Sequence, residues 1–288
     1  MPSGIVIIDK PADWTSMDVC AKLRGILKER RIGHGGTLDP MATGVLPVFV
    51  GNATRAVEFA EKGGKEYIAG LRLGMVTNTQ DSTGEVLEQR PVDVGREELE
   101  AVLPRFTGEI HQVPPMFSAI KIQGKKLYEL ARKGQEVERK PRAVAIHALE
   151  ILEQTGPERF LLRVRCSKGT YVRTLCHDIG AALGCGGCMD SLRRTMAAGF
   201  TIGQAVTLEQ VQEQGEKLLL PVDAFFAERP RFLLPSPKAE RLVRNGNPVA
   251  VPGLEPGEYR VYGREGEFLC LSRYEDGQLR SVKNFFGG

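Results

Sequence analysis

Long apolar runs are absent from this sequence of 288 residues. No run approaches the roughly eighteen apolar residues of a membrane-spanning helix, so we expect no membrane span. The N-terminus, Met1-Pro2-Ser3-Gly4, has no basic region followed by an apolar stretch, so we expect no signal peptide. Internal repeats and low-complexity tracts are also missing. The apolar content of 42% and charged content of 26% are those of a soluble globular protein with one large domain, or a large and a small one.

Cysteine is scarce and unevenly spread, with six residues in all. Without an export signal we expect reduced thiols and a cytoplasmic protein. Cys185-Gly-Gly-Cys188 is the one metal-like spacing, and zinc needs about four ligands. Only Cys176 and His177 lie near it in the sequence. We therefore expect no metal and interpret the pair as small thiols around a glycine turn, with a site completed by Cys176 and His177 as the alternative.

Charge is nearly balanced, since the net charge is only +3. Its distribution is uneven, because residues 118–142 carry eight Lys or Arg against three Glu. The basic side chains are Lys121, Lys125, Lys126, Arg132, Lys133, Arg139, Lys140 and Arg142. Apolar residues are sparse there, so we expect an insertion that protrudes from the core. It is either a surface that contacts phosphates or a solvated polar face.

Residues 33–47, GHGGTLDPMATGVLP, concentrate residues that break regular structure. Four glycines and two prolines surround a single carboxylate, Asp39. Helices and strands do not tolerate this density, so we expect a shaped loop, and such loops often carry function. Asp39 is either a functional acid or the N-cap of a short turn that begins at Pro40. Gly44 and Pro47 leave little helix for a cap to serve.

Hydrophobic periodicity predicts a mixture of helices and strands. Thr15 or Ser16 is expected to cap a helix whose apolar face holds Val19, Leu23, Ile26 and Leu27. Further helices are expected over 52–59, 96–106, 126–132, 170–183 and 208–214, strands over 5–8, 65–73, 143–153 and 159–166, and a polar loop over 77–84. After Phe226 the composition changes. We interpret 228–230 and 234–237 as a linker, followed by a small all-β module punctuated by glycines.

Four segments together resemble one enzyme family. Residues 7–11, IIDKP, with Thr15-Ser16 are similar to its opening strand and loop, and residues 33–44 are similar to its catalytic loop. Lys65-Glu66-Tyr67 followed by Leu73-Gly74 resembles its tyrosine strand, and residues 167–174, SKGTYVRT, resemble its arginine motif. The family is the TruB-type tRNA pseudouridine synthases. The resemblance covers residues 3–226, and the tail resembles the PUA module that follows the catalytic domain in many members.

This resemblance implies an α+β fold. It predicts a catalytic domain over 1–228, with a central mixed, largely antiparallel sheet, flanking helices and an RNA-gripping insertion over 112–142. A PUA-like module, a small β-barrel, is expected over 232–288. The implied reaction is isomerisation of uridine to pseudouridine at position 55 in the T loop of tRNA. It needs a flipped-out base and no cofactor or metal.

The resemblance also implies roles for single residues of the site. Asp39 is the one catalytic carboxylate, and Arg173 is expected to form a bidentate pair that keeps it ionised and oriented. Tyr67 stacks on the uracil ring and places its hydroxyl near the reacting atoms. His34 helps to hold the flipped-out conformation, and Leu192 lines the pocket.

Further residues are expected at the RNA. Lys10 and Asp81 either contact RNA or brace the pocket, and Tyr171 of the arginine motif binds substrate. Lys121, Lys125 and Lys126 belong to the insertion that grips the T arm by neutralising phosphates. The catalytic loop departs from the family pattern at Gly35, where threonine is common, and this glycine is expected to loosen the backbone beside His34.

Three functions compete at this stage. The first is the enzyme, and the second is a non-catalytic tRNA-binding or tRNA-folding chaperone on the same scaffold. The third keeps the chemistry but uses a guide RNA. Asp39, Tyr67 and Arg173 together favour the enzyme, because binding alone needs none of them. No long basic tail or docking segment is evident, which favours action without a protein partner. The resemblance implies a monomer, and we expect no membrane association.

Overall fold

The computed structural model describes residues 2–122 and 124–287. Met1, Gln123 and Gly288, which fall within the expected domains and insertion, lie outside the described residues. The strands up to Thr201 are β1 (Gly4–Lys10), β2 (Ile32–His34), β3 (Thr43–Val50), β4 (Lys65–Leu73), β5 (Met75–Thr77), β6 (Val86–Gln89), β7 (Gly108–Gln112), β8 (Lys121–Ile122), β9 (Lys125–Lys126), β10 (Arg142–Gly156), β11 (Arg159–Cys166), β12 (Gly187–Ala197) and β13 (Phe200–Thr201). The helices of this part are α1 (Ser16–Leu27), α2 (Val57–Lys62), α3 (Arg96–Val102), α4 (Leu127–Ala131), α5 (Val172–Ala182) and α6 (Leu208–Gln214), with 3-10 turns η1 (Gly51–Ala56), η2 (Leu103–Phe106), η3 (Ile202–Gln204), η4 (Gly215–Leu218) and η5 (Val222–Phe226).

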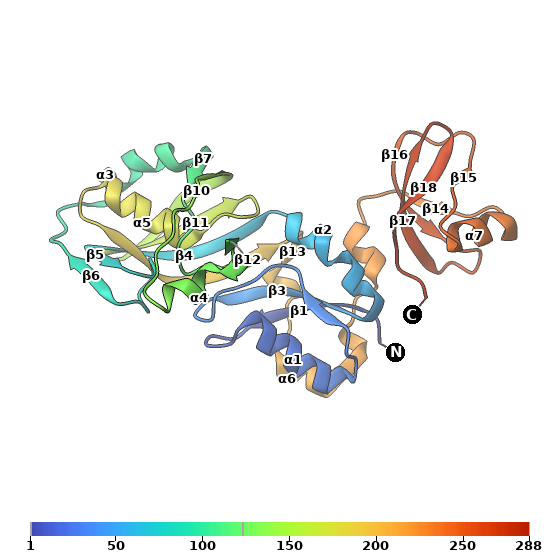
Figure 1. The fold of residues 1–288 in the computed structure, drawn as a ribbon, viewed down its shortest axis with the longest axis horizontal. Coiled ribbons are helices and arrows are strands. Elements are labelled where there is room, and N and C mark those ends of the chain that lie inside the picture. The colour runs from blue at the N-terminus through green and yellow to red at the C-terminus, as the bar shows by residue number, and fades with distance from the viewer. Residues whose placement is uncertain (1, 123, 288) are drawn as a thin grey trace.

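One mixed sheet runs through the larger part of the molecule (Figure 1). Its strand order is β1-β3-β12-β4-β11-β10-β7, with β2 paired to β3 and β13 to β12. Among the strands described for this sheet, β12 and β3 pair in parallel and the other pairs are antiparallel, so the expected mixed, largely antiparallel sheet is confirmed. The short pairs β5–β6 and β8–β9 stand apart from it.

The two halves of the sheet are covered differently. Around β4, β11 and β12 the side chains pack under α5 and α3. Strands β1 and β3 are buried on both faces: Ile8 and Leu46 pack with α1 and α6, whereas Ile5 and Phe49 pack against η1 and the aromatic residues that follow α6. This double burial explains why both strands are nearly continuous apolar runs.

Helix α1 forms as expected. Thr15 is its N-cap and makes a capping box with Asp18, and Val19 and Leu23 are fully buried on its inner face. None of the helices within the described residues is long and apolar enough to cross a membrane.

The C-terminal module is a curled five-stranded sheet with one helix. It comprises β14 (Arg231–Leu233), α7 (Pro237–Arg244), β15 (Val249–Ala250), β16 (Gly257–Tyr262), β17 (Phe268–Glu275) and β18 (Gln278–Asn284), in the order β14-β16-β17-β18-β15. The expected small β module is confirmed, but the linker over 234–237 and the absence of a helix were wrong, because residues 236 and 237 begin α7. Ser236 caps α7 by accepting from the backbone N–H of Ala239, and Pro237 lies in the first turn of the helix. Serine and proline are typical of helix starts as well as of linkers, so composition alone did not distinguish the two.

The module packs directly on the rest of the chain (Figure 1). Phe226 meets Phe59 and Phe285 at ring-centroid distances of 5.4 and 5.6 Å. The Arg55 guanidinium donates to the backbone carbonyls of Asn284 and Phe286 at 3.1 and 3.0 Å. An aromatic cluster and hydrogen bonds to the terminal strand thus hold the module against the sheet.

Candidate active site

The loop between β2 and β3 carries Asp39 and contains no helix. Residues 40 and 41 form the short turn expected after Asp39, and the Ala42 N–H donates to the Asp39 carbonyl at 3.0 Å, but the Asp39 side chain lies against Arg173, with Oδ2 2.9 Å from Nε, which favours the functional acid over the cap. The loop is fastened from behind, because the Leu38 N–H donates to Ser16 Oγ at 2.9 Å and the Asp13 N–H donates to the Pro40 carbonyl at 2.9 Å. Asp39 therefore stands on a loop whose backbone is held on both sides.

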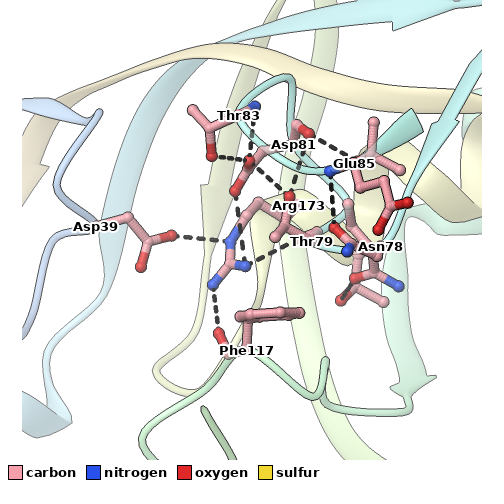
Figure 2. Close-up of polar contacts among 11 residues, drawn as sticks. Asp39, Asn78, Thr79, Asp81, Thr83, Glu85, Phe117 and Arg173 are labelled. Carbon is pink, nitrogen blue, oxygen red and sulfur yellow. Dashed lines mark hydrogen bonds and ion pairs between the residues drawn. The ribbon is translucent and has the colours of Figure 1, made fainter. Parts of the chain in front are cut away.

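Arg173, in the first turn of α5, is the ionic partner of Asp39. Arg173 Nε lies 2.9 Å from Asp39 Oδ2, and the side chains are 7% and 37% exposed, respectively (Figure 2). The expected pairing is present, but as a single contact rather than a bidentate one. The other two nitrogens are already used: Nη1 donates to the Thr79 carbonyl at 3.0 Å and Nη2 to the Phe117 carbonyl at 2.9 Å.

Asp81 supports the same arginine from the loop that follows β5. Its Oδ2 lies 3.7 Å from Arg173 Nη1. Its Oδ1 accepts from Thr79 Oγ1 at 2.8 Å, and from the N–H and hydroxyl of Thr83 at 3.0 and 2.6 Å. Figure 2 shows this carboxylate and Asp39 on different sides of the guanidinium. Asp81 is only 5% exposed, so the geometry is that of a brace.

Tyr67 and Leu192 form part of the apolar wall beside this network. They lie on β4 and β12, and are 6% and 8% exposed. Burial raises the pKa of the Tyr67 hydroxyl, and the Asp39 charge adds to this, while the Arg194 charge opposes it. Tyr67 is therefore neutral at neutral pH.

His34, at the end of β2, is half-buried. Its Nδ1 atom is buried without a hydrogen-bond partner among the described residues. Burial, and then the charge of Arg194, lower the pKa of this imidazole, so it is neutral near pH 7. Gly35 beside it is tightly packed, because a Cβ at this position would lie 2.7 Å from Ala60 Cβ.

Lys10 braces the loop from within the protein. Its side chain is fully buried, and Nζ donates to the carbonyls of Pro11, Trp14 and Pro40 at 2.7, 2.6 and 3.1 Å. Burial lowers the pKa of Lys10 to about 8. Of the two alternatives for Lys10, contact with RNA or bracing, this geometry favours bracing.

The basic insertion contains both packed and exposed positions. Leu127 of α4 is fully buried and the Phe117 carbonyl binds Arg173, so the expectation that the whole insertion protrudes was wrong for this part. Lys121 and Lys126 pair across β8 and β9, and Lys121 and Lys125 are exposed to solvent.

Tyr171, immediately before α5, ties the insertion to the arginine motif. Its backbone N–H donates to Gln112 Oε1 at 3.0 Å, and its carbonyl accepts from Gln112 Nε2 at 3.2 Å. Burial raises the pKa of its half-buried side-chain hydroxyl.

All six cysteines are buried thiols, and Cys166, Cys176 and Cys185 belong to the same hydrophobic cluster as Tyr67 and Leu192. Cys185 and Cys188 flank the start of β12, and Cys176 lies on α5, packed against it. Within residues 2–122 and 124–287, no group of three or more His, Cys, Asp or Glu side chains is placed to hold a metal ion.

Comparison with known families shows which family this chain belongs to. A profile described as TruB family pseudouridylate synthase, N-terminal domain, matches residues 24–172, and one described as tRNA pseudouridylate synthase B C-terminal domain matches residues 173–227. The chain belongs to the TruB family. It is therefore an isomerase of the pseudouridylate synthase class.

Relatives within the family are similar over nearly the whole chain. Proteins named tRNA pseudouridine synthase B from Azoarcus sp. (strain BH72) and Dechloromonas aromatica (strain RCB) are each 45% identical over 96% of this chain and 93% of the relative. A chain of a Cbf5–Nop10–Gar1 complex superposes with a TM-score of 0.74 at 28% identity, covering 98% of this chain and 85% of that chain. A chain of an H/ACA RNP bound to a substrate RNA containing 2′-deoxyuridine gives 0.73 at 27% identity, covering 99% and 85%.

Sequence reasoning missed two parts of this TruB-family site. The Phe117 carbonyl carries no side-chain signal, so only the tertiary structure places it on Arg173. Arg194 is fully buried behind the catalytic loop. The sequence did contain a clue to this burial. Arg194 directly follows the half-exposed Arg193, and neighbouring residues of a strand point to opposite faces, so one of the two arginines had to face inwards.

Proposed function

We propose that this protein isomerises a uridine of tRNA, at position 55 in the T loop, with Asp39 as the only catalytic carboxylate. The observation that carries the proposal is the asymmetry of the Asp39–Arg173 pair. The arginine is buried and bonded on all sides, whereas the carboxylate is 37% exposed and uses only Oδ2 among the described residues. A carboxylate oxygen is thus held in a fixed position that is open to solvent.

The reaction conserves all atoms. The N1–C1′ bond of uridine breaks, the base turns, and a C5–C1′ bond forms; C5 loses its hydrogen to water and N1 takes up a proton. Asp39 attacks the sugar, attacks the base or removes a sugar proton, and all three roles need an oriented carboxylate. The chemistry is redox-neutral, and we assign no cofactor and no metal.

The side chains around Asp39 suit a base that has left the RNA stack. Tyr67 supplies a flat, neutral ring and Leu192 an apolar wall, and a flipped base is held by such stacking. His34 is neutral and half-buried at the end of β2, which fits a role in stabilising the flipped conformation. Lys10 and Asp81 brace the catalytic loop and Arg173, and Tyr171 anchors the start of α5.

Tritium release tests the assignment directly. The purified chain alone, with a chelator present, is incubated with tRNA transcript labelled with tritium at C5 of uridine. We expect release of one tritium per transcript, and none from a transcript with cytidine at position 55. Absence of release would refute the isomerase activity and favour the non-catalytic chaperone. Release from the cytidine transcript would refute modification at position 55 of the T loop. Release that needs an added guide RNA would contradict independent action.

We assign RNA binding to the insertion over 112–142 and to the PUA-like module over 232–288, with the T arm across the insertion. The exposed Lys121 and Lys125, with Lys126 beside them, supply positive charge within reach of phosphates. The solved Cbf5 structures contain partner proteins. For this chain we propose a monomer that needs none.

Reversing two charges of the insertion is expected to weaken tRNA binding. Lys125→Glu/Lys126→Glu should raise the Kd about tenfold or more and reduce the slope of log Kd against log salt by about 2, because each phosphate contact releases counterions. Kd is measured at several salt concentrations. The control Lys22→Glu/Lys217→Glu makes the same charge change at exposed sites on α1 and η4. An equal loss in both variants would show a general charge effect and contradict the assignment.

A further inference from the structure

Arg194, on β12, is a buried arginine without an ionic partner. Its side chain is 0% exposed, and among the described residues no carboxylate oxygen lies within 4.0 Å of its nitrogens. A buried charge of this kind is costly unless hydrogen bonds compensate it. The hydrogen bonds that Arg194 makes therefore indicate why the position holds an arginine.

All three guanidinium nitrogens bond to backbone carbonyls on either side of Asp39, two in the catalytic loop and one on β3. Nε donates to the Val45 carbonyl at 2.7 Å, Nη1 to the Thr37 carbonyl at 3.2 Å and Nη2 to the Gly36 carbonyl at 3.1 Å. Gly36 and Thr37 precede Asp39 in the chain, and Val45 follows it. One rigid, planar group thus joins both arms of the loop that carries the carboxylate.

The backbone of Arg194 makes a second connection at the same place. Arg194 pairs with Gly44 of β3 on one side and with Tyr67 of β4 on the other. Gly44 has a φ of +101°, and a Cβ there would lie 2.2 Å from the Arg194 carbonyl oxygen. Only glycine permits this approach. Strand β12 therefore links the base of the loop directly to the strand that carries Tyr67.

We propose that Arg194 is a positioning residue for the isomerisation: its guanidinium fastens both arms of the catalytic loop to β12 and so fixes Asp39 relative to Tyr67. The inference rests on the proposed function of Asp39. A displacement of about 1 Å of a reacting group costs about 100-fold in rate, so loosening this attachment acts on turnover rather than on RNA affinity.

Arg194→Lys tests the proposal, because lysine keeps the charge but has a single nitrogen in place of the planar fork. We expect the single-turnover rate of tritium release to fall about 100-fold, with the Kd for a T-arm RNA within about threefold of the wild type. Hydrogen exchange of the amides of residues 36–45 should accelerate, while that of β10 and β11 stays unchanged.

A core variant separates positioning from general destabilisation. Val211→Ala removes buried volume on α6, away from the loop, and is expected to lower Tm while keeping the rate within about threefold. The proposal is overturned if Arg194→Lys keeps the wild-type rate of tritium release, or if the variant loses RNA affinity rather than rate. It is also overturned if Val211→Ala, with a Tm equal to that of Arg194→Lys, shows an equal loss of rate.

The wild type provides a test that needs no variant. In 15N-arginine-labelled protein, the guanidinium protons of Arg194 should exchange slowly, and exchange at the rate of a free arginine would overturn the attachment even if Arg194→Lys does not fold. These signals and the amide exchange do not depend on activity. A wild type without tritium release would therefore refute the proposed function while the attachment is still tested.

Discussion

Asp39→Asn is expected to abolish isomerisation, lowering the rate of tritium release by about 10⁴-fold or more. Asparagine has nearly the same shape, and its carbonyl oxygen can still occupy the place of Oδ2, which lies 2.9 Å from Arg173 Nε in the native pair. The site should therefore remain assembled. What disappears is the negative charge that a nucleophile or base requires. The measurement is single-turnover release from tRNA transcript labelled at C5, with Kd measured in parallel.

Asp9→Asn is the matched control for this substitution. Asp9 Oδ2 lies 2.8 Å from Arg193 Nη2, so it is also a partly exposed carboxylate paired with an arginine. It lies on β1, outside the site. We expect its rate to stay within about threefold of the wild type, as for most changes that leave the reacting groups in place. Tritium release by Asp39→Asn at a rate near that of the wild type would refute the role of Asp39.

Arg173→Met should cause the second-largest loss, about 10³-fold in rate and about 3 kcal/mol in the free energy of unfolding. The change removes the cation that the buried Asp81 and the half-exposed Asp39 share. It also leaves the Thr79 and Phe117 carbonyls without their donor. Stability is measured by denaturant unfolding and activity by single-turnover tritium release.

A second substitution separates the two losses. Asp81→Asn, added to Arg173→Met, removes the stranded buried charge and should recover part of the unfolding free energy. The rate should stay low, because Asp39 still lacks its orienting partner. If rate and stability recovered together, Arg173 would act through stability alone, contrary to the proposed role.

Arg173 also explains how far the site could be predicted. Its pairing with Asp39 was predicted through the match of two motifs that lie far apart in the chain. The single rather than bidentate contact was not, because it follows from the Thr79 and Phe117 carbonyls that occupy the other nitrogens. Every residue has a backbone carbonyl, so the sequence does not show which carbonyls bind a side chain. Only the tertiary structure identifies them.

The fold was predictable where local signals are strong. Helix α1, strand β4 and helix α6 follow from periodicity and capping residues. Strand β12 was missed, although it lies at the centre of the sheet. Its sequence places two arginines in a row, and one of them is fully buried. A pattern based on hydrophobicity cannot assign a buried arginine to the interior, because its hydrogen-bond partners come from another strand.

The sequence by itself determined the type of chemistry: one carboxylate in a glycine-rich loop, an aromatic strand, an arginine motif and a basic insertion. Each is a local pattern that the family match could identify. The tertiary structure alone decided which groups hold the carboxylate in place. Lys10, Asp81 and Arg194 became braces because each is buried and must satisfy its charge with the polar groups that the fold brings to it. Burial and partners are properties of the packed chain, and residue types do not specify them.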